Sequence, residues 1–130
     1  MTIKLTQFAY LVDEYDRAID YFTNILGFAL VSDEDMGGGK RWVVVAAGGD
    51  GAKILLAKAK GNRQNDTIGD QFGGRVGLFL ETDNFEETYS RFKRNGVKFT
   101  EEPRREPYGI VAVFEDIYGN FWDLIHYAKN

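Results

Sequence analysis

The sequence predicts an α+β protein made of two tandem βαβββ modules, and three observations support this fold class. The chain has 130 residues, of which 44% are hydrophobic and 15% aromatic, enough for the core of one ordinary domain. The same order of elements, a strand, an amphipathic helix and three strands, is predicted twice along the chain. A shift of about seventy residues aligns Asp13 with Asp83 and Phe22 with Phe92, which indicates an internal duplication.

The first module is expected at about residues 1–60. Residues 3–12 are apolar and β-prone, which predicts a strand. Apolar residues at helical spacing follow and predict an amphipathic helix, with Asp13 placed to cap it and Gly27 placed to end it. Three strands separated by glycine-rich turns are then predicted at 28–33, 41–48 and 52–59.

The second module, at about residues 74–130, repeats this order. A strand is predicted at 74–82, and a helix at 83–96 that Asp83 caps and Gly96 stops. Three more strands are predicted at 97–103, 109–116 and 120–128. The polar, glycine-rich residues 61–73 are the expected connector, so we predict a single domain, 1–130, made of two modules.

The composition excludes several classes of function. Sixteen basic and twenty acidic residues give a net charge of −4 without a basic block, which argues against nucleic acid and anionic membranes as partners. The chain contains no cysteine, so disulfides, thiolate nucleophiles and thiolate metal sites are excluded. The N-terminal residues lack the pattern of a signal peptide and no run is long enough to span a bilayer, so we expect a cytoplasmic protein.

Two segments carry a resemblance to a known family: QFAYLVDEYDRAIDYFTNILGF at 7–28 and FEDIYGNFWDLI at 114–125. With the duplicated order between them, the chain resembles the vicinal oxygen chelate superfamily of glyoxalase I, extradiol dioxygenases and bleomycin and fosfomycin resistance proteins. The resemblance implies an open, cup-like mixed sheet with a small-molecule site on its concave face, and commonly a homodimer. It does not imply one reaction, because this family uses one scaffold for many chemistries.

The resemblance also implies where a divalent metal would bind. Active members hold it with His or Gln on the first strand of each half and Glu on the fourth, and the matching positions here are Gln7, Gly77, Leu55 and Asp123. Only Gln7 and Asp123 keep donor atoms, which leaves most of a hard cation's coordination to water or substrate. We therefore expect no metal cofactor, or at most a weakly bound divalent ion at Gln7 and Asp123.

Asp123 lies between apolar residues of the last predicted strand, and three roles stay open for it. It could transfer a proton, together with Glu81, because apolar walls raise the pKa of a carboxyl. It could bind a cationic or amine-bearing ligand, or accept hydrogen bonds from Gln7 or an arginine in a structural network. The single histidine, His126, is out of step with Asp123 and is expected to face the other side of the sheet.

Other ligand-binding candidates are residues expected near the cup or over its mouth: Arg41, Trp42, Leu55, Phe72, Arg75, Phe79 and Tyr108. Trp42, Phe72 and Phe79 could form an aromatic slot for a flat ligand, or pack as core residues. Phe72 could instead pin the connector. A period of two places Arg75 on the face of Glu81, where it would bind an anion or, more simply, pair with Glu81.

The sequence thus predicts a glyoxalase-like protein that binds a small organic molecule in its cup. Two classes compete: a metal-dependent or metal-independent enzyme of lyase, isomerase or dioxygenase type, and a resistance protein that sequesters an antibiotic or toxin without catalysis. A third possibility is a fold kept for binding a partner protein.

Overall fold

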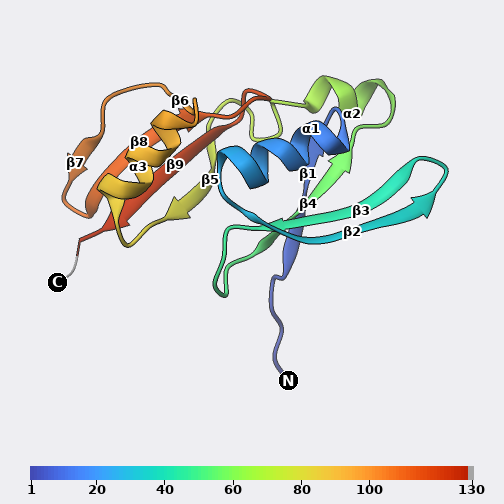
Figure 1. The fold of residues 1–130 in the computed structure, drawn as a ribbon, viewed down its shortest axis with the longest axis horizontal. Helices are drawn as coiled ribbons and strands as arrows, with labels where there is room; N and C mark the ends of the chain where they lie inside the picture. The colour runs from blue at the N-terminus through green and yellow to red at the C-terminus, as the bar shows by residue number, and fades with distance from the viewer. Residues whose placement is uncertain (129–130) are drawn as a thin grey trace. The chain divides into compact units, whose positions relative to one another are not determined.

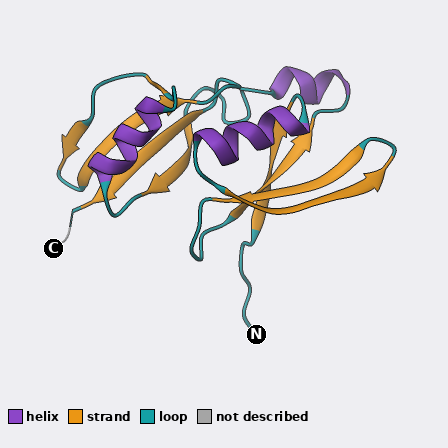
Figure 2. Cartoon of the chain, in the orientation of Figure 1, coloured by secondary structure: helices purple, strands orange, loops and turns teal. Residues whose placement is uncertain are grey.

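The computed structural model of the chain describes residues 1–128 and divides into two compact units, Met1–Ile68 and Gly69–Asn130. Each unit contains one mixed, open β-sheet and a helix that follows its first strand (Figures 1 and 2). The predicted α+β class and the duplicated βαβββ order are confirmed.

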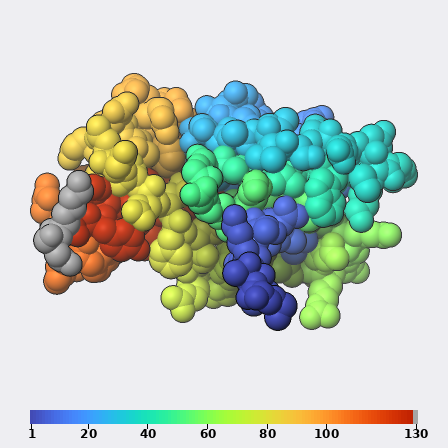
Figure 3. Space-filling model, turned by 90° about the horizontal axis from the view of Figure 1, so that it is seen from below, coloured from blue at the N-terminus to red at the C-terminus, as the bar shows by residue number. Residues whose placement is uncertain are grey.

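Unit 1 has a four-stranded sheet in the order β1-β4-β3-β2, in which β1 and β4 are parallel and the other pairs antiparallel. Its elements are β1 (Gln7–Val12), α1 (Tyr15–Asp20), a π-helical turn η1 (Tyr21–Ile25), β2 (Ala29–Gly37), β3 (Lys40–Ala46), β4 (Lys53–Lys58) and α2 (Gly61–Thr67). The first strand is shorter than the predicted 3–12: residues 1–6 are exposed and lie outside β1 (dark blue in Figure 3), although the Thr6 carbonyl accepts the Lys53 N–H of β4 at 2.9 Å.

Unit 2 repeats this topology in the order β5-β9-β8-β6, with β5 and β9 parallel. Its elements are β5 (Val76–Glu81), α3 (Phe85–Arg94), β6 (Lys98–Phe99), β7 (Arg104–Glu106), β8 (Gly109–Glu115) and β9 (Phe121–Tyr127). The strand predicted at 97–103 is instead two short strands, β6 and β7, which both pair with β8. Pro103 lies between them and has no N–H to donate to a ladder.

The helix starts differ from the prediction by one residue in both units. The N-cap of α1 is Glu14, not Asp13, whose carboxylate accepts the Glu14 N–H at 2.7 Å and pairs with Arg17. The N-cap of α3 is Asn84, not Asp83, and its side chain accepts the Glu87 N–H at 3.2 Å. The same offset in both halves agrees with their common origin.

The helix ends confirm Gly27 and Gly96 as stops, and they also explain a one-residue difference between the halves. Both glycines have positive φ, +79° and +87°. The residue after each glycine donates its N–H to the carbonyl of the equivalent phenylalanine: Phe28 to Phe22 and Val97 to Phe92. The bond in the first half spans one residue more than the bond in the second half. The π-helical turn η1 absorbs this extra residue, as π-bulges do.

Each unit buries an aromatic core between its helix and one face of its sheet. In unit 1, α1 packs on β3 and β4, and the ring of Phe22 meets Tyr10 edge-to-face at 5.6 Å. In unit 2, α3 packs on β9, and Phe92 meets Phe114 edge-to-face at the same distance. In unit 2 the described residues form one helix, α3, so the opposite sheet face has no helix of its own unit, while in unit 1 the second helix, α2, contacts β1. The sheet faces opposite α1 and α3 are the candidate functional surfaces.

The predicted connector contains a short helix, α2, that its polar composition did not indicate. Side chains bond back to the helix backbone, with Asn65 donating to the Gly61 carbonyl at 2.9 Å and Thr67 to that of Arg63 at 2.7 Å. Within residues 1–128, no helix is long and apolar enough to cross a membrane.

Candidate functional site

Unit 1 contains a hollow of about 590 Å³ between the far end of the β2–β3 hairpin and the junction of β4 with α2. The hairpin contributes Gly38–Trp42, the junction contributes Leu55–Lys60 with Gln64 of α2, and α1 contributes Tyr15. β4 pairs with β3 only at Val43–Val45, so the hairpin runs on without a neighbour beyond that point (Figure 1). This unpaired end leaves room for the hollow.

Trp42 is the exposed aromatic residue of this hollow, because it lies on the sheet face opposite α1. Side chains alternate along β3, so Val43 and Val45 point to the helix side and are fully buried, while Trp42 and Val44 point to the other side. The Trp42 side chain is 37% exposed. It provides a flat apolar surface beside Leu55 and Ala57, which are half-buried and line the same hollow.

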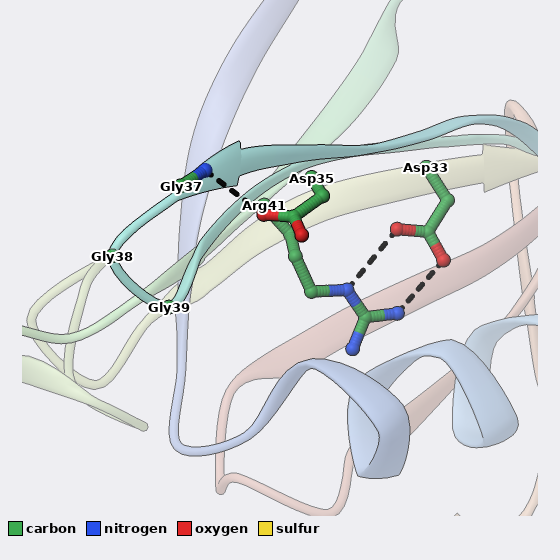
Figure 4. A pocket seen from close by; sticks show the side chains of 6 residues that line it. All are labelled: Asp33, Asp35, Gly37, Gly38, Gly39 and Arg41. Carbon is green, nitrogen blue, oxygen red and sulfur yellow. Dashed lines mark hydrogen bonds and ion pairs between the residues drawn. The ribbon is translucent and has the colours of Figure 1, made fainter.

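Arg41 points to the opposite face and is engaged by the protein itself. Its guanidinium binds Asp33 through two hydrogen bonds of 3.1 and 2.7 Å (Figure 4), binds Asp16 at 2.8 Å, and lies over the ring of Tyr15. The bond from Arg41 lowers the pKa of Asp33. Its predicted role in ligand binding stays a prediction, but two carboxylates already satisfy its charge.

The hairpin also borders a second depression, of about 450 Å³, lined by Asp33, Asp35, Gly37–Gly39 and Arg41 (Figure 4). Its carboxylates have partners, since Asp33 binds Arg41 and Asp35 accepts the Gly37 N–H at 2.8 Å. A depression whose charges are satisfied internally is a weaker candidate site than the hollow around Trp42.

Gln7 and Leu55, the two unit 1 positions of the family's metal site, share the sheet face of Trp42. Gln7 lies opposite Lys53, and Leu55 lies between Ala9 of β1 and Val44 of β3. Gln7 provides an amide oxygen here, but Leu55 presents only methyl groups.

Asp123 lies on the sheet face of unit 2 opposite α3, between Phe79 of β5 and Val113 of β8. Its half-buried carboxylate forms no hydrogen bond or ion pair within residues 1–128. Burial raises its pKa, an effect that Arg104 opposes and Glu101 reinforces. Phe79 beside it is 60% exposed, so an apolar surface and an unpaired acid adjoin one another.

The second-half position of the metal site is filled by an aromatic ring. A Cβ added to Gly77 would lie 2.1 Å from Cγ of Phe72, so the Phe72 ring packs against the glycine backbone. No donor can stand at this position without displacing the ring. Together with Leu55, this means that the residues present do not fit the family's four-ligand metal site, and no three His, Cys, Asp or Glu residues of the described chain cluster to form another.

The remaining candidates of unit 2 are Arg75, Glu81 and Tyr108, and Glu81 is two residues along β5 from Phe79, the strand partner of Asp123. The ladder shifts register between Val76 and Leu78, so the period of two that placed Arg75 with Glu81 does not hold across Gly77. Arg75 donates to the Val76 carbonyl at 3.3 Å, and the expected ion pair with the exposed Glu81 is not formed. Tyr108 is 45% exposed, with its ring centroid 6.5 Å from that of Tyr127.

Two residues of the last strand region have structural roles. His126 is on the helix side of β9, as predicted, and its Nδ1 lies 2.8 Å from the Thr82 carbonyl. Asp116, which the sequence analysis missed, is buried and accepts the N–H groups of Tyr118, Gly119 and Asn120 at 2.9–3.1 Å, and Trp122 Nε1–H at 2.8 Å. An Asp two to four residues before a Tyr-Gly-Asn turn was the available signal for such a network.

Comparison with known proteins agrees with this geometry. Residues 4–124 match the Glyoxalase/Bleomycin resistance protein/Dioxygenase superfamily. An uncharacterised protein of Shewanella frigidimarina (strain NCIMB 400) is 47% identical over 96% of this chain and 94% of its own length.

Two solved structures are also similar to the chain. UcmS2 has a TM-score of 0.81 and 29% identity, covering 96% of this chain and 98% of that one. TnmS3, an antibiotic binding protein from Streptomyces sp. CB03234, has a TM-score of 0.75 and 27% identity, covering 98% and 99%. The chain belongs to the Glyoxalase/Bleomycin resistance protein/Dioxygenase superfamily.

Proposed function

We propose that this protein binds a small organic molecule with a flat apolar part, without a metal ion, and that Trp42 in the hollow of unit 1 is its main contact. The observation that carries the proposal is the exposed Trp42 beside Leu55 and Ala57 in a hollow of about 590 Å³. Pockets for drug-sized ligands have volumes of about 300–1,000 Å³ and apolar linings. The similarity to TnmS3, described as antibiotic binding, supports a sequestering role over catalysis.

A thermal-shift screen of planar polycyclic compounds, with and without divalent ions, tests this proposal. We expect compounds that raise Tm equally in both conditions, and a Trp42→Ala variant that binds them at least about tenfold more weakly, the range of an aromatic anchor in a binding site. Met36→Ala is the matched control, because Met36 is 56% exposed in the same sheet but does not line the hollow. Unchanged binding by Trp42→Ala would refute the proposal.

A second candidate function rests on Asp123. A half-buried carboxyl with a raised pKa and no hydrogen-bond partner is suited to proton transfer, as in a metal-independent isomerase or lyase. Deuterium uptake from D₂O next to the carbonyl of small hydroxyketones measures such transfer. Activity that survives EDTA and is lost in Asp123→Asn would support this function, whereas activity that the variant keeps would exclude Asp123 as the base.

We also propose that two copies of the chain form a homodimer and that the protein works in the cytoplasm, as its family likeness and sequence suggest. Sedimentation equilibrium tests the first proposal: a single species with the mass of one chain at all concentrations would contradict it. Cell fractionation with an antibody against the protein tests the second.

A further inference from the structure

The hollow around Trp42 carries a surplus of positive charge. Four of the residues that line it are cationic, Lys40, Arg41, Lys58 and Lys60, and none of its lining residues is acidic. The chain as a whole has a net charge of −4, so this cluster runs against the overall balance. Charge of one sign around a concave surface raises the local concentration of ions of the opposite sign.

Two of these four cations are already neutralised by the protein. Arg41 binds Asp16 and Asp33 at 2.8 and 2.7 Å, and Lys58 pairs with Glu14 at 3.4 Å. Lys40 and Lys60 differ, since neither forms an ion pair with any carboxylate of residues 1–128. Lys40 and Lys60 are therefore the two cations of the lining that no ion pair within the described chain holds. By strand pairing the acid Glu34 lies opposite Trp42, but it does not line the hollow.

Lys40 and Lys60 approach the hollow from its two sides. Lys40 opens β3 directly after the Gly37–Gly39 turn, and Lys60 lies between β4 and α2. Gln64 adds a side-chain amide next to Lys60. Its Oε1 accepts the backbone N–H of Lys60 at 2.9 Å, which orients the Gln64 side chain. Both cations thus border the same volume as Trp42 and Leu55.

We propose that the ligand of this hollow is an aromatic acid: a flat apolar ring system bearing a carboxylate, sulfonate or phosphate. The ring contacts Trp42 and Leu55, and the acidic group lies near Lys40 and Lys60. This inference rests on the proposed function and specifies the ligand class of the same site. It also excludes an amine-bearing ligand here, because its charge would be repelled by both lysines.

Three probes of equal size test the ligand class: 2-naphthoate, 2-naphthamide and 2-naphthylmethylammonium, which are anionic, neutral and cationic. Binding is followed by calorimetry and by the fluorescence of Trp42 in a Trp122→Phe background. We expect naphthoate to bind about tenfold more tightly than naphthamide, the product of two exposed ion pairs worth about threefold each. Tenfold more salt should reduce this preference.

The variant Lys40→Met/Lys60→Met should lose the preference and still bind naphthamide as the unmodified protein does. Lys4→Met/Lys93→Met has the same net charge, changes two exposed lysines outside the hollow, and should keep the preference. Equal affinity for naphthoate and naphthamide in the unmodified protein, or an equal loss of preference in both double variants, would overturn the inference. Failure of all three probes to bind would instead overturn the proposed function.

Discussion

Asp116 gives the sharpest prediction about stability, because one buried carboxylate organises the turn before β9. Its Oδ1 accepts three backbone N–H groups, and its Oδ2 accepts Trp122 Nε1–H at 2.8 Å, with Trp122 only 1% exposed. Asp116→Ala removes all four bonds and leaves buried donors unsatisfied. Hydrogen bonds to a charged group contribute about 1.5–3 kcal/mol each and are not additive, so we expect a loss of more than about 4 kcal/mol.

Asp116→Asn separates the two halves of this network. The amide oxygen can still accept the three backbone N–H groups, but the amide NH₂ would face Trp122 Nε1–H, donor against donor. We expect a loss of about 2–3 kcal/mol, the cost of one such bond and an unsatisfied buried donor. In a Trp122→Phe background the same substitution should cost about 1.5 kcal/mol less, because the opposing donor is absent.

Urea unfolding followed by far-UV circular dichroism measures these differences, and hydrogen exchange of the Gly119 and Asn120 amides reports the turn directly. Asp83→Asn is the control, since Asp83 is exposed and forms no hydrogen bond or ion pair within the described chain. It should change stability by less than about 0.5 kcal/mol. An Asp116→Asn loss as small as that, or one that is equal in both Trp122 backgrounds, would refute the reasoning.

Three other sites give predictions that can be checked in the same way. Gly77→Ala places a Cβ 2.1 Å from Phe72 Cγ and should lower the free energy of unfolding by about 1–3 kcal/mol. In a Phe72→Ala background the same substitution should cost much less, because the ring is absent. An equal cost in both backgrounds would contradict the contact. Asp123→Asn should stabilise the protein near pH 7, because burial, which raises the pKa of the Asp123 carboxyl, disfavours its charged form in the folded state. This gain should disappear as the pH falls below the ordinary aspartate pKa, where the group is protonated in both states, and a constant gain would argue against burial as the cause. Deleting Asn24 removes the extra residue of the π-helical turn, so the protein should stay folded with a regular helix, as measured by circular dichroism. Deleting Ser90 from the regular helix α3 should unfold unit 2, because the deletion moves Phe92 out of the core.

The parts of the fold that the sequence predicted are those that depend on short periodic patterns. The spacing of Phe22 and Phe92 identified the buried faces of both helices, and both residues lie in the cores. The helix starts were one residue off because Asp13 and Asp83 are also good cap residues by composition. The helix α2 was missed because its stability comes from side-chain bonds to its own backbone, which leave no apolar period.

The site was less predictable, since it depends on register and on charge pairing. Trp42 and Leu55 were expected near the cup, but which of Trp42 and its neighbour faces inward depends on the strand alternation, which puts Trp42 and Leu55 on the sheet face opposite α1. The same count failed for Arg75, because a register shift at Gly77 resets the alternation. The sequence could not show which cations of the hollow have an ion-pair partner. Arg41 pairs with Asp16 of α1 and Lys58 with Glu14 just before α1, and both acids are distant in sequence.

The two halves have diverged where packing constrains them least. On the helix-facing side of each sheet the equivalent phenylalanine keeps an aromatic contact, Phe22 with Tyr10 of β1 and Phe92 with Phe114 of β8, because a loss there leaves a cavity in the core. The opposite faces differ in charge: the hollow of unit 1 is cationic around Trp42, while unit 2 presents Asp123 beside Phe79. A duplicated scaffold that keeps its cores and changes the chemistry of its open faces therefore offers two different surfaces, a cationic one around Trp42 and an acidic one at Asp123.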